Sequence, residues 1–321
     1  MPPVIDVHVH LIALSENNGA LFSARMRNNP LFRIYLSAAH GYRGNDEVFD
    51  RAYVAKLITT IRESKTTDRA VLLALDGVYD GKGKLDTSRT DAYIPNDYCR
   101  RICDKHPEFL FGPSVNPNRA DAIDELVRVK SLGAVLIKWL PSSQDFDPAD
   151  KKYRSFYKKL AELKLPLLSH TGYEHCVPVT NQLYGDPELL VPALNEGVTV
   201  IAGHAGTSGR GHPVEFFGRY LEMLDRYSNL YGDLAAVTGL TRFSYIPDML
   251  KRAGFMNRHL QATDYPAPPM PWLMPGRLGP FKAARLSFKR NIFDRDVETK
   301  LALGFPESIL TNAASLLGVN D

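Results

Sequence analysis

Short apolar runs recur along the chain and are separated by longer segments in which apolar residues have helical spacing. Most of these runs are apolar on both faces, as is typical of strands buried in a parallel sheet. They lie at residues 4–10, 70–75, 109–115, 134–140, 165–170, 198–204, 229–234 and 259–264. We therefore predict eight strands that alternate with helices.

Helices are predicted most clearly at residues 90–106, 121–133, 152–164 and 214–228, and residues 296–318 supply closing helices. This alternation predicts a (β/α)8 TIM barrel, with residues 1–321 as a single domain. Two connections are oversized, namely 11–49 after the first strand and 265–295 after the eighth. Connections of this length in a compact domain are usually functional lids or interface arms.

Composition narrows the class of protein. The 321 residues carry a formal net charge of +3 without a dense Lys/Arg stripe, which argues against a nucleic-acid partner. No apolar run approaches the ~20 residues of a membrane helix, and the N-terminus lacks signal-peptide features. Three cysteines are too few for a disulfide framework. We therefore expect a cytoplasmic protein without a membrane partner.

Histidine and aspartate recur where the predicted strands end. His8 and His10 are two residues apart in a strand, so they share a face and would repel each other if both were charged. A divalent metal removes this repulsion because it binds neutral imidazoles. Further strands end near Lys138, at His170, at His204, and at Asp233 and Asp264. Barrel enzymes build their sites at this end, so the recurrence predicts a metal site with three nitrogen ligands and one oxygen ligand.

Several short segments carry a family resemblance. They read DVHVH, IKWLP, LLSHTG, VIAGHAG, YGDLAA, ATDYP and NAASLLG, in this order over nearly the whole chain. The chain resembles the amidohydrolase superfamily, within it the branch of metal-dependent hydrolases that includes aminocarboxymuconate semialdehyde decarboxylase. This resemblance implies a distorted barrel and a catalytic divalent metal, Zn²⁺ or another ion such as Mn²⁺. It also leaves a homodimer open.

The resemblance assigns roles to individual residues. His8, His10, His170 and Asp264 match the metal ligands, and His204 matches an acid/base residue. Lys138 lies where binuclear relatives carry a carboxylated lysine, which would make His204 a ligand of a second metal. We expect one metal per chain. An unmodified Lys138 would bind a substrate anion or be structural.

Two reactions on a small-molecule substrate are compatible with these residues. The leading hypothesis is hydrolysis of an amide, lactone or similar carbonyl compound by metal-activated water, with His204 and Asp264 as the catalytic pair. The alternative is non-oxidative decarboxylation of an aromatic or muconate-like acid. A barrel that only binds is disfavoured because His204 and Asp264 are both present.

Residues that would bind the substrate are predicted less sharply. Decarboxylation needs a cation to orient the carboxylate, and arginine presents a planar fork to such groups. The first long connection contains Arg25, Arg27, Arg33 and Arg43, of which we expect at least one to face the site. The predicted substrate set is Lys138, His175 and Arg43, although His175 would equally fit a surface loop.

Overall fold

The computed structural model describes residues 2–40, 44–209, 211–252 and 254–319. All eight predicted strands are present in it. They are β1 (Ile5–His10), β3 (Arg69–Leu73), β5 (Phe109–Gly112), β6 (Ile137–Trp139), β7 (Leu167–His170), β8 (Val200–Gly203), β9 (Leu230–Asp233) and β10 (His259–Leu260). They form two parallel sheets, ordered β1-β3-β5 and β10-β9-β8-β7-β6.

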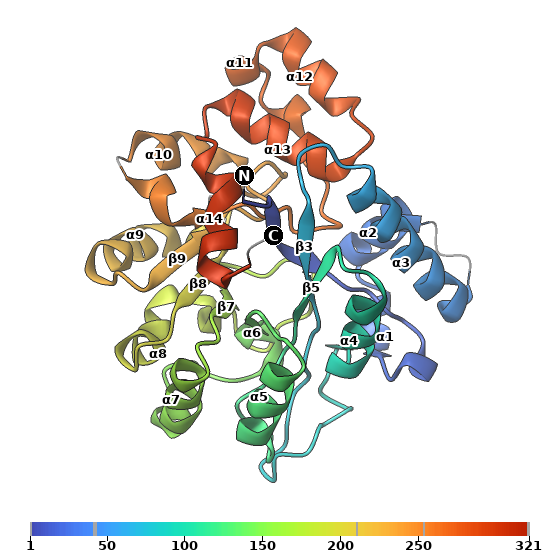
Figure 1. The fold of residues 1–321 in the computed structure, drawn as a ribbon, viewed down its shortest axis with the longest axis vertical. Helices are drawn as coiled ribbons and strands as arrows, with labels where there is room; N and C mark the ends of the chain where they lie inside the picture. The colour runs from blue at the N-terminus through green and yellow to red at the C-terminus, as the bar shows by residue number, and fades with distance from the viewer. Residues whose placement is uncertain (1, 41–43, 210, 253, 320–321) are drawn as a thin grey trace.

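The two sheets meet at two seams, where single bridges replace a continuous ladder. At the first seam Ser114 bridges Lys138, and the Lys138 N–H donates to the Pro113 carbonyl at 2.8 Å. At the second seam Val9 bridges Tyr265, and the Val7 N–H donates to the Gln261 carbonyl at 3.0 Å. The strands therefore surround one centre with helices outside them, as Figure 1 shows. This arrangement confirms a distorted (β/α)8 barrel.

The outer helices bury one face against the strands. They are α3 (Asp46–Arg62), α4 (Asn96–Lys105), α5 (Ala122–Ser131), α7 (Arg154–Glu162), α8 (Val191–Asn195), α9 (Phe216–Arg226), α10 (Ile246–Lys251), α13 (Ile292–Leu303) and α14 (Ser308–Leu317). In α9 the buried positions Phe216, Tyr220 and Met223 follow the helical period. The Asn291 side chain caps α13 at its start, and Gly304 ends it with a φ of 99°.

Both long connections are folded. The first holds η1 (Glu16–Asn18), β2 (Leu21–Phe22), α1 (Ala24–Arg27) and α2 (Pro30–His40). Its β2 pairs antiparallel with β4 (Ala92–Tyr93). The second connection holds η8 (Pro271–Leu273), α11 (Pro275–Leu278) and α12 (Pro280–Ser287). The remaining short elements are α6 (Pro141–Gln144), η2 (Lys151–Tyr153), η3 (Gln182–Gly185), η4 (Pro187–Leu190), η5 (His204–Gly206), η6 (Phe243–Tyr245) and η7 (Phe255–Arg258).

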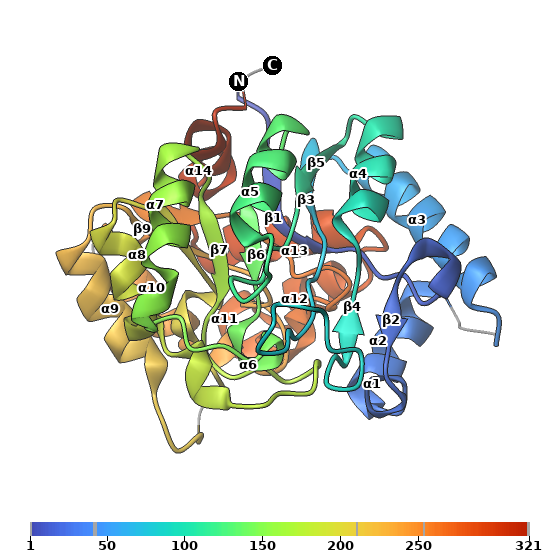
Figure 2. The same cartoon turned by 90° about the horizontal axis from the view of Figure 1, so that it is seen from below.

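The strands place polar side chains at one end of an apolar interior. Leu136, Leu168 and Ala262 belong to one buried apolar cluster. Each lies two residues before a polar residue, namely Lys138, His170 and Asp264. Because side chains two apart in extended backbone share a face, the buried residue directs its polar successor to the same side. The chain termini lie together at the opposite end from α1 and α6, as Figure 2 shows.

No helix within the described ranges is long and apolar enough to cross a membrane.

Candidate active site

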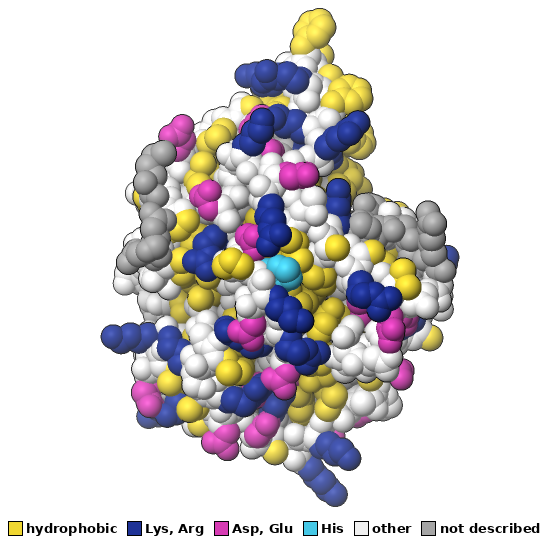
Figure 3. Space-filling view, turned by 45° about the vertical axis from the view of Figure 1, so that its right-hand side comes forward, with side chains coloured by type: hydrophobic (Ala, Val, Ile, Leu, Met, Phe, Trp, Pro, Cys, Tyr) yellow, Lys and Arg dark blue, Asp and Glu magenta, His cyan; other side chains and the backbone are white. Residues whose placement is uncertain are grey.

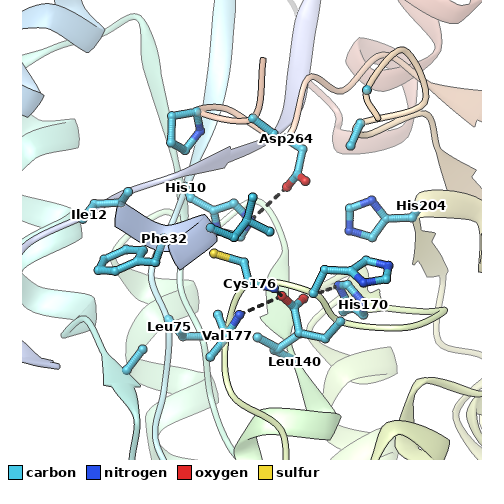
Figure 4. Close-up of a pocket in the computed structure, with 18 of the residues that line it drawn as sticks. His10, Ile12, Phe32, Leu75, Leu140, His170, Cys176, Val177, His204 and Asp264 are labelled. Atoms are coloured by element: carbon cyan, nitrogen blue, oxygen red, sulfur yellow. Dashed lines mark hydrogen bonds and ion pairs between the residues drawn. The ribbon is translucent and has the colours of Figure 1, made fainter. Parts of the chain in front are cut away.

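Four histidine rings gather at the carboxyl ends of the strands. The ring centroids are 4.9 Å apart for His8 and His10, 5.1 Å for His8 and His204, and 4.6 Å for His170 and His204. Figure 4 shows the carboxylate of Asp264 beside His10 and on the same side of the cavity as His204. Its Oδ1 lies 3.1 Å from Nε2 of His10 and 3.6 Å from Nε2 of His8. The structure thus brings together the residues that the sequence predicts at four strand ends.

The backbone turns sharply where two of these residues lie. His204 has a φ of 63° and Asp264 a φ of 69°, in the left-handed region that residues with a side chain rarely adopt. Such conformations cost about 1–3 kcal/mol each and cluster at functional sites. Asp264 also lies beyond the short β10, where its N–H donates to the His8 carbonyl at 3.0 Å. These turns aim both side chains into the cavity.

Asp233 holds two neighbouring elements in place. Its Oδ2 accepts a hydrogen bond from Nδ1 of His8 at 2.7 Å, and its Oδ1 accepts one from the backbone N–H of His204 at 2.7 Å. Because Nδ1 of His8 then carries the proton, its Nε2 is a hydrogen-bond acceptor. Nζ of Lys138 donates to that Nε2 at 2.8 Å. Asp233 therefore has two partners, the His8 ring and the His204 backbone.

His170 has a partner on one side of its ring. Its Nδ1 lies 3.4 Å from a carboxylate oxygen of Glu174, a residue that the sequence analysis does not single out. Its Nε2 is buried and has no hydrogen-bond partner among the described residues. A buried polar atom without a partner is rare in proteins, and a metal ion would satisfy this one.

Burial controls the charge of the site. It lowers the pKa of His8, His170 and His204 well below 6.5, with smaller contributions from nearby cations such as Lys138. Burial also lowers the pKa of Lys138 to about 8. Burial alone would raise the pKa of Asp264, but its hydrogen bond with His10 and the positive charges around it bring the pKa below 3.8. His8, His170 and His204 are therefore neutral and the carboxylate of Asp264 is ionised, which is the state that metal binding requires.

These donors fit a divalent metal. Donor atoms of His8, His204 and Asp264 all lie within 4.8 Å of one another. The orphaned Nε2 of His170 and the exposed edge of His10 add two further donors at the same end of the cavity. Nitrogen ligands with a carboxylate suit Zn²⁺ and related ions. The group of donor atoms within 4.8 Å of one another includes His204. These distances are compatible with His204 as a ligand and with His204 as an acid/base residue.

The metal donors open into a cavity of about 530 Å³. Most residues that line it are apolar, and its polar end also contains Arg242. This arginine is 4% exposed, and its Nη1 and Nη2 donate to the Thr207 hydroxyl at 3.1 Å and to the Tyr173 carbonyl at 3.2 Å. Among the described residues no carboxylate lies within ion-pair distance of its guanidinium. A buried cation with unused donors is suited to bind an anion.

The predicted substrate residues have different outcomes. Lys138 lies among the candidate metal-binding side chains, next to His8, and also lines the cavity. His175 lines the cavity, and its Nε2 donates to the Ser208 carbonyl at 2.9 Å. Arg43 lies outside the described residues.

The other arginines of the first connection do not line the cavity. Arg25 and Arg27 pair with Asp91 and Asp46, at 3.5 and 2.8 Å, and Arg33 is exposed. The arginine that lines the cavity is Arg242, which the sequence analysis misses. The signal that could have identified it is a lone arginine after the seventh strand, in the segment TGLTRF.

Comparison with known proteins identifies the family. The family model described as amidohydrolase matches residues 5–297, which is most of the chain. The chain belongs to the amidohydrolase family. No curated protein matches this amidohydrolase by sequence.

Solved structures share the fold of this amidohydrolase at low sequence identity. An uncharacterised TIM-barrel protein of Bordetella bronchiseptica is 15% identical over 98% of both chains, with a TM-score of 0.66. A Pseudomonas putida protein assigned as a 2-pyrone-4,6-dicarboxylic acid hydrolase is 16% identical over 99% of this chain and 98% of that one, with a TM-score of 0.58. The 2,6-dihydroxybenzoate decarboxylase from Rhizobium is 17% identical over 99% of both chains, with a TM-score of 0.56. Both reaction types left open by the sequence thus occur on this fold. The family match supports an enzyme.

Proposed function

We propose that this amidohydrolase is a metal-dependent hydrolase that adds water to the carbonyl group of a small compound bearing a carboxylate. One observation carries the proposal. Neutral imidazoles, an ionised Asp264 and the buried guanidinium of Arg242 line the same end of one cavity. The histidines and Asp264 serve the reaction, and Arg242 serves recognition.

The proposed ligands are His8, His10, His170 and Asp264, which would hold one ion per chain, Zn²⁺ or another divalent metal such as Mn²⁺. A divalent ion in such a site supplies a Lewis acid that lowers the pKa of a bound water to about 7. Asp233 and Glu174 support this set because each faces the Nδ1 side of a ligand ring, so that the Nε2 lone pair points away from the carboxylate.

The protein's own groups then move the proton. Asp264 is ionised and is the proposed acceptor for the proton of the attacking water. His204 donates through Nδ1 to the Ala235 carbonyl at 3.1 Å, so its Nε2 keeps a free lone pair. We propose that this nitrogen relays the proton to the leaving group. Arg242 holds the substrate carboxylate and thereby orients the carbonyl next to these two residues.

Decarboxylation of an aromatic or muconate-like acid is the second candidate. The position of Arg242 is compatible with it, since a cation at the reacting end can hold the carboxylate that is lost as readily as one that is kept. The two reactions differ in product, because decarboxylation releases CO₂ and hydrolysis incorporates oxygen from water.

Metal content and product analysis test both proposals. We expect about one Zn²⁺ or Mn²⁺ per wild-type chain, a strong loss in His170→Ala and retention in His204→Asn, with His175→Ala as the matched cavity control. Loss of the metal in His204→Asn would make His204 a ligand, and two ions per chain would indicate a carboxylated Lys138. Reaction of lactones, amides and aromatic acids in ¹⁸O-water then separates hydrolysis from CO₂ release. Turnover without metal would overturn both candidates.

The homodimer that the family resemblance leaves open stays a prediction, which sedimentation of the purified chain would test.

A further inference from the structure

The cavity is larger than its polar end requires. An apolar cavity of about 150 Å³ accommodates one benzene ring. The volume of about 530 Å³ therefore has room for roughly three groups of that size. A small acid or lactone held by Arg242 and the metal donors would leave most of this space unfilled.

The remainder of the cavity is an apolar arm, which we define by Ile12, Phe22, Met26, Phe32, Ala92 and Ile94. Figure 4 shows Ile12 and Phe32 on the opposite side of the cavity from His204. Met26 and Phe32 are each only 2% exposed, although both belong to the first long connection. This connection therefore packs as part of the protein core while it walls the arm.

Several contacts fix the shape of the arm. Phe22 stacks on Phe32 with ring centroids 5.4 Å apart, and Phe22 pairs with Ala92 across the β2–β4 ladder. The amide of Asn29 donates to the Cys176 carbonyl at 2.9 Å, which ties the first connection to the wall on the other side. A preformed apolar wall favours an apolar ligand, because little ordering is left to occur on binding.

The arm continues to the surface. Ile34 and Leu240 both line the cavity, yet they are 60% and 61% exposed. Figure 3 shows hydrophobic side chains gathered on one face of the molecule, with Lys and Arg side chains around them. Exposed apolar side chains at the mouth of a cavity mark a binding groove rather than a random surface.

We propose that the substrate carries an apolar group comparable in bulk to two aromatic rings, which occupies the apolar arm while its carboxylate meets Arg242. The position of the carboxylate rests on the proposed function, whereas the arm rests on cavity volume and lining alone. Each methylene that leaves water for the arm should raise affinity about fourfold, the equivalent of about 0.8 kcal/mol.

Calorimetric titration of the zinc-loaded protein with benzoate and with its 4-ethyl, 4-butyl and 4-hexyl derivatives tests this inference without requiring turnover. We expect affinity to rise about fourfold per methylene until the arm is filled. Ala92→Phe narrows the arm and should weaken 4-butylbenzoate at least tenfold while changing benzoate less than twofold. Ala284→Phe, on the exposed face of α12, is the matched control. Should Ala92→Phe fail to fold, Ile34→Ser at the mouth should weaken 4-hexylbenzoate alone.

The outcomes separate the arm from the proposed function. Equal affinity along the series, or no binding of any derivative, would overturn the arm. The same chain-length dependence for the neutral methyl esters would support the arm but count against Arg242 as the carboxylate anchor. Equal losses for benzoate and 4-butylbenzoate in Ala92→Phe would also overturn the arm, because the butyl group would then gain no affinity from the space beside Ala92.

Discussion

Replacement of Arg242 by methionine removes a buried cation of the cavity, leaves the other one, Lys138, in place and keeps most of the cavity volume. A hydrogen bond to a charged group contributes about 1.5–3 kcal/mol. Loss of one such bond to a substrate carboxylate lowers kcat/KM about 10- to 150-fold. The same change should have little effect on the stability of the folded chain. Arg242→Met saves the desolvation of a 4% exposed guanidinium and loses two hydrogen bonds, to Thr207 and Tyr173.

Each hydrogen bond from the charged guanidinium contributes about 1.5–3 kcal/mol, and burial of the ion costs several kcal/mol, so the two effects roughly cancel. The free energy of unfolding of Arg242→Met should therefore stay within about 1 kcal/mol of wild type or rise. Steady-state kinetics on an acid and on its uncharged amide, together with urea unfolding, measure both effects. Arg33→Met, at an exposed arginine of the first connection, is the control. Equal losses of kcat/KM on the acid and the amide would refute the role of Arg242 as a carboxylate anchor, and a loss of several kcal/mol in stability would refute the burial argument.

Three further predictions concern the residues around the site and the core. Asp233→Asn should weaken metal binding about 10- to 100-fold in a chelator competition, because the His8 ring loses its orienting carboxylate; unchanged affinity would contradict this. Burial lowers the pKa of His259 to about 3, so it stays neutral in the folded chain while the unfolded chain takes up a proton near pH 6.5. The contribution of neutral His259 to the free energy of unfolding is therefore complete above pH 6.5 and is lost as pH falls toward 3, by about 2 kcal/mol at pH 5. The difference in this free energy between wild type and His259→Asn, measured by urea unfolding, should decrease over the same pH range. Lys300→Met should cost about 3–5 kcal/mol, since it leaves the buried Asp296 without the ammonium 2.6 Å away, and adding Asp296→Asn should recover part of that loss in the same assay.

The strands and the metal donors could be predicted because both depend on local pattern. Buried parallel strands are apolar on both faces, and their carboxyl ends must meet at one end of a barrel. This geometry brings His8, His170 and His204 together from strands far apart in sequence. The extent of β10 was less predictable, because Asp264 leaves the strand through a left-handed turn that the apolar run 259–264 does not signal.

Recognition residues depend on loop paths, which carry no periodic signal. Arg242 reaches the cavity because the chain after β9 turns at Ala236, which has a φ of 53°, and the Ala236 N–H donates to the Thr263 carbonyl. The arginines of the first connection are more numerous, but the described ones are paired or exposed. The number of arginines in the first connection therefore pointed to that segment, whereas Arg242, the arginine that lines the cavity, follows β9.

The first long connection and the strand ends form different parts of the cavity. On the proposed function, the reacting groups lie at the strand ends, where the candidate metal ligands meet. The shape of the apolar arm resides largely on residues 11–40 and on the β2–β4 pair, which the barrel strands do not require for their pairing. Exchange of that connection between related barrels is therefore a route to new substrate ranges that leaves the reacting centre intact.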